Sequence, residues 1–298
     1  MTVTAERAAR AGVAASRLRT GTLAALGSAL AYGSTVVIGR SLARDGLDGA
    51  PVLTCRFGLS ALLLVGFQLW RGSVAPPPGE RLRTFGLGVL YAGQARVFFA
   101  ALGRGSAGAV ALVFYSYPAM VALAELARRT TRWSARLGGA LALSVGGVVT
   151  VVAVEGDLFI SATGVLFALG SAALFTTYLL AGDSLLDATD AVVKAAWISG
   201  GAALTLAAVA LGSGGDWPGL DRAPLLLGYG VANAAAFGLM FVALPRIGPT
   251  RTAVMLNFEV VSSVGLAAVV LDERFAPLQA IGGLGVVVGA ILAATTQD

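Results

Sequence analysis

The chain has 298 residues, of which 57% are hydrophobic and only 12% are charged, and its formal net charge is +5. A soluble domain carries about 25% charged residues, so this composition excludes a soluble globular protein. With no histidine and a single cysteine, Cys55, the chain also lacks the ligands and bases of zinc sites, haem sites, His-based triads and internal disulfides.

Residues 1–20 are rich in arginine and alanine, and we expect them to form a mobile cytoplasmic tail. The apolar segments that follow are close to the roughly 20 residues that cross a bilayer as a helix. Membranes admit only helices and closed barrels, and a barrel strand needs only about 9–11 alternating residues, so these segments predict helices. The ten predicted spans are 21–39, 51–70, 84–102, 105–126, 135–153, 161–181, 190–211, 223–243, 248–271 and 277–295.

Three short sequences recur at an almost constant spacing, which predicts a duplicated unit. The stretch GTLAALGSALAYGS begins at Gly21, and the similar GVLFALGSAALFTT begins at Gly164. The sequence FAALGR, from Phe99, recurs as FVALPR from Phe241, at a spacing one residue shorter. At this shorter spacing, TRW, which ends at Trp133, recurs as ERF, which ends at Phe275. Because each unit holds an odd number of spans, the second unit must cross the membrane in the opposite direction.

The predicted fold is therefore an all-α integral membrane protein with ten transmembrane helices arranged as two inverted five-helix repeats. The first repeat covers residues 21–153 and the second, inverted repeat covers residues 161–295. Inverted repeats are typical of secondary transporters, whose substrate site lies near the middle of the bilayer where the repeats meet.

The distribution of arginine predicts that both termini lie in the cytoplasm, with the protein in the inner (plasma) membrane. Cytoplasmic loops carry an excess of Lys and Arg, and with this orientation thirteen arginines fall inside against five outside. The inside set is Arg7, Arg10, Arg17, Arg19, Arg71, Arg81, Arg83, Arg128, Arg129, Arg132, Arg136, Arg246 and Arg251, and the outside set is Arg40, Arg44, Arg104, Arg222 and Arg274.

Glu259 is the one carboxylate near the middle of a predicted span, and its helical face also carries Met255, Ser262 and Ser263. A charge inside the bilayer costs roughly 2.5–3.5 kcal/mol even on the lenient insertion scale, so it usually serves a function. Glu259 is therefore a candidate to bind a substrate amine or a proton. A structural hydrogen bond to a neighbouring helix is the alternative.

Other polar and aromatic side chains near mid-span are candidates to line a cavity between the repeats. Tyr117 and Tyr115 correspond to Glu259 and Asn257 in the repeat register, and their position away from the membrane surfaces argues against simple interfacial anchoring. The complete candidate set is Tyr32, Tyr91, Gln94, Phe98, Tyr115, Tyr117, Phe175, Tyr178, Asn233, Phe237, Asn257 and Glu259.

Two further features favour structural roles. Arg56 in the second span and Lys194 in the seventh lie near opposite ends of their spans, where anchoring at the membrane interface is the favoured interpretation. The fifth and tenth spans are rich in glycine, including Gly285 and Gly289, which lets helices approach closely and is weakly indicative of a dimer.

The chain resembles the EamA type of the drug/metabolite transporter superfamily, over about residues 21–295. The resemblance is carried by the five-plus-five spans, by "RF" in the second span, "YP" in the fourth, and the long stretch that begins at Ala243. Val260 stands where the family usually has a proline after the glutamate. The matching residues of the ninth and tenth spans are Glu259, Glu273, Arg274, Pro277, Leu278 and Gln279.

The resemblance implies a membrane transporter in which the first, third, fourth, sixth, eighth and ninth spans surround a central cavity. We expect alternating-access transport, outward, of an amino acid or related metabolite, with efflux of amphipathic drugs as the alternative. A membrane-embedded enzyme and a non-transporting scaffold are less favoured. The expected partners are a small-molecule substrate and the lipid bilayer, with proton coupling through Glu259 as a hypothesis; no cofactor, metal or nucleic acid is expected, and a monomer is favoured.

Overall fold

The computed structural model describes residues 2–47, 49–72, 75–153, 159–185, 188–213, 216–270 and 276–295. The described chain is helical throughout its regular structure, apart from an isolated bridge between Gly105 and Ile160. The helices are α1 (Thr2–Arg44), α2 (Gly49–Trp70), α3 (Pro78–Leu102), α4 (Ala107–Phe114), α5 (Tyr117–Ala127), α6 (Ala135–Val152), α7 (Ala162–Ser184), α8 (Ala191–Ser213), the short 3₁₀ helix η1 (Leu220–Arg222), α9 (Ala223–Leu256), α10 (Phe258–Val270) and α11 (Pro277–Thr295).

Nine helical stretches in the described part of the chain are long and apolar enough to cross a membrane, and α10 is a shorter apolar helix. The stretch that contains α9 holds more than one span, because Gly248 interrupts it with a φ of 77° and a ψ of 165°. The eighth span therefore ends before Gly248, and the ninth consists of the end of α9 followed by α10. This arrangement confirms the predicted fold of ten transmembrane helices in two inverted five-helix repeats; Glu273 and Arg274 lie outside the described residues.

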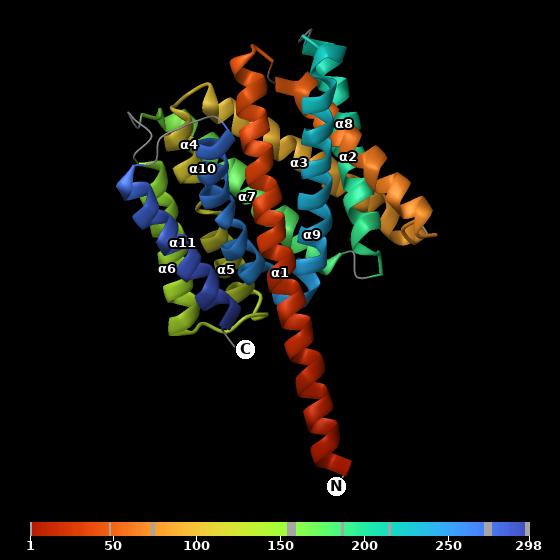
Figure 1. Ribbon diagram of the computed structural model, residues 1–298, viewed down its shortest axis with the longest axis vertical. Coiled ribbons are helices and arrows are strands. Elements are labelled where there is room, and N and C mark those ends of the chain that lie inside the picture. Colours follow the sequence, from red (N-terminus) through yellow and green to blue (C-terminus); the bar gives the residue numbers. More distant parts are fainter. Residues whose placement is uncertain are drawn as a thin grey trace.

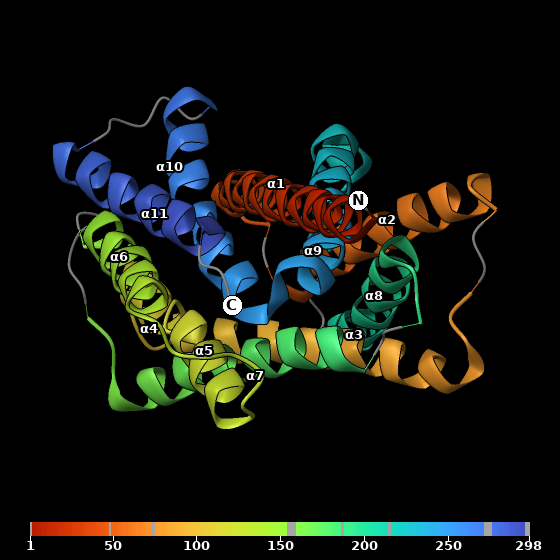
Figure 2. The ribbon, with the colours of Figure 1, turned by 90° about the horizontal axis from the view of Figure 1, so that it is seen from below.

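The inverted arrangement is visible in the way the helices pack. The two termini lie at the same end of the helix bundle (Figure 1). Helix α1, which begins the first repeat, packs along α9, while its counterpart α7 packs along α3 and α4. Seen along the bundle, α1 and α10 therefore lie across the molecule from α3 and α7 (Figure 2). The first span of each repeat packs on the third span of the other.

Equivalent hydrogen bonds in the two repeats support this relation at the level of single atoms. The Ser28 hydroxyl donates to the carbonyl of Ala236 over 2.7 Å. Its counterpart in the second repeat, Ser171, donates to the carbonyl of Gln94 over 3.3 Å. Gln94 and Ala236 are themselves counterparts in the repeat register, so the register relates both partners of the bond.

The fourth and ninth spans are both broken near their middle, at equivalent positions. The fourth span is interrupted between α4 and α5 at Tyr115 and Ser116, and Pro118 lies in the first turn of α5. The ninth span is interrupted at Asn257, which is the counterpart of Tyr115 in the repeat register. Val260, three residues further on, stands where the family that the sequence resembles usually has a proline. The helix is interrupted at Asn257 without that proline.

Helices α6 and α11, the fifth and tenth spans, pack closely against each other through glycine. A Cβ added to Gly147 would lie 2.5 Å from the carbonyl oxygen of Gly282, and a Cβ on Gly282 would lie 2.6 Å from the carbonyl oxygen of Gly147. A Cβ on Gly289 would meet the backbone nitrogen of Ser144 at 2.8 Å. The glycine-rich sequence thus serves contact between helices of one chain.

Residues 2–20 continue the helix of α1, so the chain enters the first span without a turn. Alanine and arginine are among the strongest helix formers, which accounts for the helical backbone of this segment. The helix projects from the bundle toward the N-terminus (Figure 1). Near the bundle, Arg17 Nη2 donates to the carbonyl of Pro245 over 2.8 Å. Mobility and a cytoplasmic position of this segment remain predictions.

The packing of α6 on α11 makes a testable prediction about two adjacent glycines. A Cβ at Gly147 must push α11 away, whereas a Cβ at Gly146 meets nothing within 4 Å. We expect Gly147→Ala to destabilise the protein by about 1–3 kcal/mol, the usual range for overpacking. We expect Gly146→Ala to be neutral or slightly stabilising, because alanine is the better helix former. Thermal unfolding in one detergent compares the two, and equal melting temperatures would contradict the packing described.

Candidate functional site

Aromatic side chains from both repeats meet at the centre of the bundle. Tyr91 of α3 lies at the middle of the group, with ring centroids 5.0 Å from Phe237 of α9, 5.1 Å from Tyr178 of α7 and 5.5 Å from Phe57 of α2. Tyr117 of α5 joins through Phe175 of α7 at 4.8 Å. We refer to this group, with Tyr32, Phe114 and Tyr115, as the aromatic cluster.

All eight aromatic candidates from the sequence belong to one network of ring contacts. Tyr32 of α1 lies 6.0 Å from Phe237. Tyr115 and Phe98 join through Phe114, whose ring centroid lies 5.7 Å from Tyr115 and 5.2 Å from Phe98. The network therefore draws on α1, α2, α3, α4, α5, α7 and α9, which include parts of both repeats. The candidates it brings together are Tyr32, Tyr91, Phe98, Tyr115, Tyr117, Phe175, Tyr178 and Phe237.

Two of the polar candidates, Gln94 and Asn257, make contacts between neighbouring helices. Gln94 is buried, and its Nε2 donates to the Ser171 hydroxyl of α7 over 2.8 Å. Asn257 is fully buried at the break of the ninth span, and its Nδ2 donates to the Ser144 hydroxyl of α6 over 2.8 Å. These two side chains hold helices together and are not in the ring network.

The third polar candidate, Asn233, contacts Arg56, which the sequence analysis did not include among the candidate site residues. Arg56 Nε donates to Asn233 Oδ1 over 2.7 Å, and Arg56 Nη1 approaches the Tyr229 hydroxyl at 3.4 Å. The guanidinium carbon lies 5.2 Å from the ring centroid of Phe57 and 5.0 Å from that of Tyr229. This placement differs from the interface anchoring expected for Arg56, because its contacts are with the protein interior.

The only sequence sign of this role for Arg56 was its place next to Phe57, in the "RF" pair of the second span. Arg56 and Asn233 are 177 residues apart, so no local pattern relates them. Phe57, Phe114 and Phe241 are further aromatic residues of the network that sequence reasoning missed. Phe241 lies one helical turn after Phe237, which is a spacing that places both on one face.

Glu259 lies in the first turn of α10, immediately after the break of the ninth span. Its charge interacts electrostatically with Arg56 and with the hydroxyls of Tyr32, Tyr91 and Tyr117. These groups come from α2, α1, α3 and α5, so Glu259 faces the same interior region as the aromatic cluster. The mid-span carboxylate and the arginine are thus two opposite charges of one site.

Close packing of α10 on α1 fixes the position of Glu259. The Ser262 hydroxyl lies one turn further along α10 and donates to the carbonyl of Ala29 over 3.2 Å. A Cβ on Gly33 would lie 2.1 Å from the Ser262 hydroxyl oxygen. The glycine therefore permits the approach of the two helices that carries Glu259 toward Tyr32.

The two halves contact each other at the end of the bundle where the termini lie. Glu125, at the end of α5, accepts a hydrogen bond on Oε2 from the backbone nitrogen of Thr250 over 2.9 Å. This nitrogen belongs to the first turn after Gly248, where the backbone donors of a helix start are unpaired. The Tyr117 hydroxyl, deeper in the bundle, donates to the carbonyl of Ala253 over 3.3 Å. These contacts join the two repeats at that end of the bundle.

The residues in and around the aromatic cluster differ in how exposed their side chains are. Tyr117 and Tyr178 are buried. Arg56, Tyr91, Tyr115 and Glu259 are partly exposed. Arg56, Tyr91, Tyr115 and Glu259 thus keep accessible surface beside the buried rings. We refer to the interior region bordered by these four residues as the chamber.

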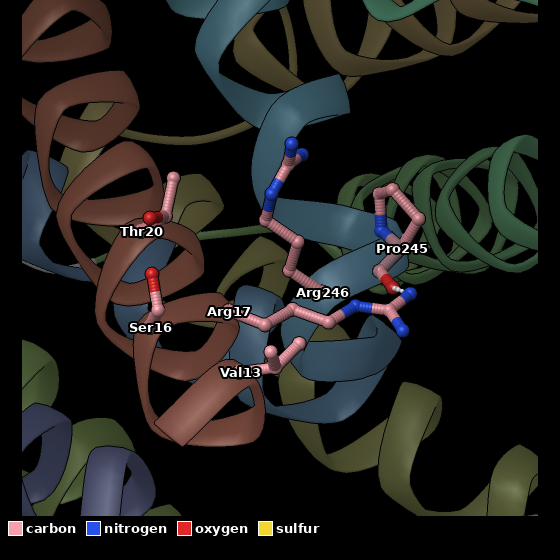
Figure 3. A pocket seen from close by; sticks show the side chains of 6 residues that line it. All are labelled: Val13, Ser16, Arg17, Thr20, Pro245 and Arg246. Atoms are coloured by element: carbon pink, nitrogen blue, oxygen red, sulfur yellow. Dashed lines mark hydrogen bonds between the residues drawn. The ribbon is translucent and has the colours of Figure 1, made fainter. Parts of the chain in front are cut away.

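Two surface pockets lie at the terminal end and do not include these residues. One, of about 530 Å³, is lined by Val13, Ser16, Arg17, Thr20, Pro245 and Arg246, between α1 and the end of the eighth span (Figure 3). The other, of about 460 Å³, borders Glu125 and the segment around Gly248. Among the residues that the structure describes, His, Cys, Asp and Glu form no group of three that could hold a metal ion.

Comparison with known proteins agrees with this architecture. The model of the EamA-like transporter family matches residues 19–153 and 162–295, one match to each repeat. A solved structure described only as "Crystal structure of protein" superposes with a TM-score of 0.79 at 20% identity, covering 92% of this chain and 98% of the other, and it supports the fold alone. A search of curated proteins found no match. The two family matches together cover nearly the whole chain, which therefore belongs to the EamA-like transporter family and is a multi-pass membrane transporter of the drug/metabolite type.

Proposed function

We propose that this protein moves a small organic solute, an amino acid or a related metabolite, out of the cell by alternating access through the chamber. The observation that carries the proposal is a partly exposed set of aromatic and charged side chains at the meeting point of the two repeats. A site near mid-membrane at a repeat interface is what transporters of inverted topology use. The proposed location is the inner (plasma) membrane with both termini in the cytoplasm, and the proposed functional unit is a monomer.

The symmetry of the fold supplies a physical route for alternating access. Two similar halves of opposite orientation can exchange their packings, and this exchange opens the chamber to one side as it closes to the other. In the conformation described, contacts such as Glu125 to Thr250 join the two repeats at the terminal end. Breaks in the fourth and ninth spans, at Tyr115 and Asn257, lie where these helices would bend.

Two other classes of function have less support. A membrane enzyme needs a nucleophile with a base or a metal group, and the chain contains no histidine. A scaffold without transport has no need for a mid-span carboxylate such as Glu259, because a charge at the centre of a span costs roughly 2.5–3.5 kcal/mol on the lenient scale. Efflux of amphipathic drugs remains the second candidate, because the aromatic cluster presents apolar ring surface to a ligand.

Purified protein tests the proposed substrate classes directly. A bound ligand raises the apparent stability by RT ln(1 + [L]/Kd), which is about 2.7 kcal/mol when the ligand is present at a hundred times its Kd. We expect apolar amino acids to raise the melting temperature in detergent. If only cationic drugs raise the melting temperature, the result would instead favour drug efflux.

The central position of Tyr91 predicts a loss of transport when its ring is removed. We expect Tyr91→Leu to lower uptake into proteoliposomes at low substrate concentration by about tenfold, which corresponds to about 1.4 kcal/mol of lost interaction. Phe67→Leu is the matched control, because Phe67 is 44% exposed and its ring contacts Trp70 near the end of α2. Equal uptake by the two variants would show that the aromatic cluster does not contact the solute.

Proton coupling through Glu259 makes a separate prediction. Glutamine has the shape of glutamate but cannot carry the negative charge or release a proton, so we expect Glu259→Gln to lose the dependence of export on a pH gradient. Asp216→Asn, at an exposed loop position, makes the same chemical change outside the chamber. Export is measured in proteoliposomes with and without an imposed gradient. If the Glu259→Gln protein kept its full dependence on the gradient, Glu259 would not be the coupling site.

A further inference from the structure

The chamber presents one positive and one negative side chain, and both are held in place by the protein. Arg56 is fixed by its bond to Asn233 at 2.7 Å and by the rings of Phe57 and Tyr229. Glu259 is fixed by the packing of α10 on α1. Arg56 belongs to the first repeat and Glu259 to the second, so each repeat supplies one of the two charges.

The bonds that hold Arg56 leave part of its guanidinium group available. They use Nε and Nη1, and the side chain is partly exposed. The Nη2 amino group, with its two N–H donors, is therefore left over for an acceptor that does not belong to these partners. Guanidinium groups bind carboxylates through parallel N–H donors on two different nitrogens, and the second N–H of Nη1 together with one of Nη2 forms such a pair. The free side of Arg56 is suited to a carboxylate of a ligand.

Glu259 and Arg56 interact through space. No direct ion pair joins these two side chains within the described part of the chain. A separated cation and anion facing one space are complementary to a ligand that carries the opposite charges at its two ends. Tyr32 and Tyr91 interact electrostatically with both charges, so their hydroxyls belong to the same region.

We propose that Arg56 binds the carboxylate and Glu259 the ammonium group of one zwitterionic α-amino acid, whose apolar side chain lies against the aromatic cluster. The inference rests on the proposed transport function. It adds the class of the substrate and the two residues that bind its charged groups. The ring of Tyr91, which is partly exposed, lies beside the site, and aromatic ring faces also attract an ammonium group.

The presence of Arg56 separates this ligand class from the drug alternative. A cationic amphipathic drug pairs with Glu259 alone and leaves Arg56 without an anionic partner, so its positive charge is opposed by that of the guanidinium. A zwitterion satisfies both side chains and leaves no net charge in the chamber. The aromatic rings alone would accept either ligand, so the arginine decides between them.

The test compares ligands that differ by a single charged group. L-phenylalanine is measured against 2-phenylethylamine, which lacks the carboxylate, and 3-phenylpropionate, which lacks the ammonium group. Affinities are obtained by titration of the purified full-length protein in detergent. We expect the wild-type protein to bind L-phenylalanine at least about tenfold more tightly than either analogue, because each analogue leaves one charge of the site without its partner.

Substitutions then assign each group to its residue. In Arg56→Gln the preference of L-phenylalanine over 2-phenylethylamine should vanish, while the preference over 3-phenylpropionate remains. In Glu259→Gln the opposite pattern is expected. Arg71→Gln is the matched control, because Arg71 also stacks on a phenylalanine of the second span, Phe67, at 5.7 Å, but lies at the end of that span. This control should keep the wild-type pattern.

Several results would overturn the assignment. Equal binding of L-phenylalanine and 2-phenylethylamine by the wild-type protein would do so without any variant, even if Arg56→Gln failed to fold. A wild-type protein that binds neither L-phenylalanine nor L-leucine would also overturn it. Flux of a cationic drug in proteoliposomes would then leave the transport function standing, whereas absence of flux for every solute in the panel would remove the transport function itself.

Discussion

The chamber depends on contacts between the two repeats. The first span of each repeat packs along the third span of the other. Helix α1 packs on α9 and α7 packs on α3, and related serine hydroxyls, Ser28 and Ser171, bond across each contact. Because these contacts lie between repeats, neither repeat can enclose an interior without its partner. The aromatic cluster and the two charges lie where these helices meet.

Small residues allow this arrangement in a membrane, where apolar side chains gain little from leaving lipid. Close contact and hydrogen bonds must therefore hold the helices together. Gly33 admits Ser262 of α10, and Gly147 and Gly282 admit each other's backbone.

The fold could be predicted because its signals are local or periodic: apolar segments indicated the spans, and a repeated spacing indicated the inversion. Mid-span tyrosines such as Tyr91 and Tyr117 were expected to line a cavity, and the structure brings their rings into one network of contacts. The role of Arg56 could not be predicted, since it depends on Asn233, which is 177 residues away. For the same reason the sequence did not distinguish Gln94 and Asn257, whose bonds to Ser171 and Ser144 join helices, from side chains that face the chamber.

The two ends of the chamber differ chemically although the repeats are symmetric in fold. At the terminal end a buried carboxylate, Glu125, pairs with the start of the ninth span at Thr250. In the repeat register that relates Tyr115 to Asn257, Glu125 corresponds to Ala267 and Thr250 corresponds to Gly108. A packing exchange that closed the opposite end would therefore bring alanine and glycine together, without the charge-assisted bond, which contributes about 1.5–3 kcal/mol. In the proposed mechanism this bond therefore has no equivalent at the opposite end. A solute that binds both charges would contribute to the exchange only through contacts that differ between the two packings.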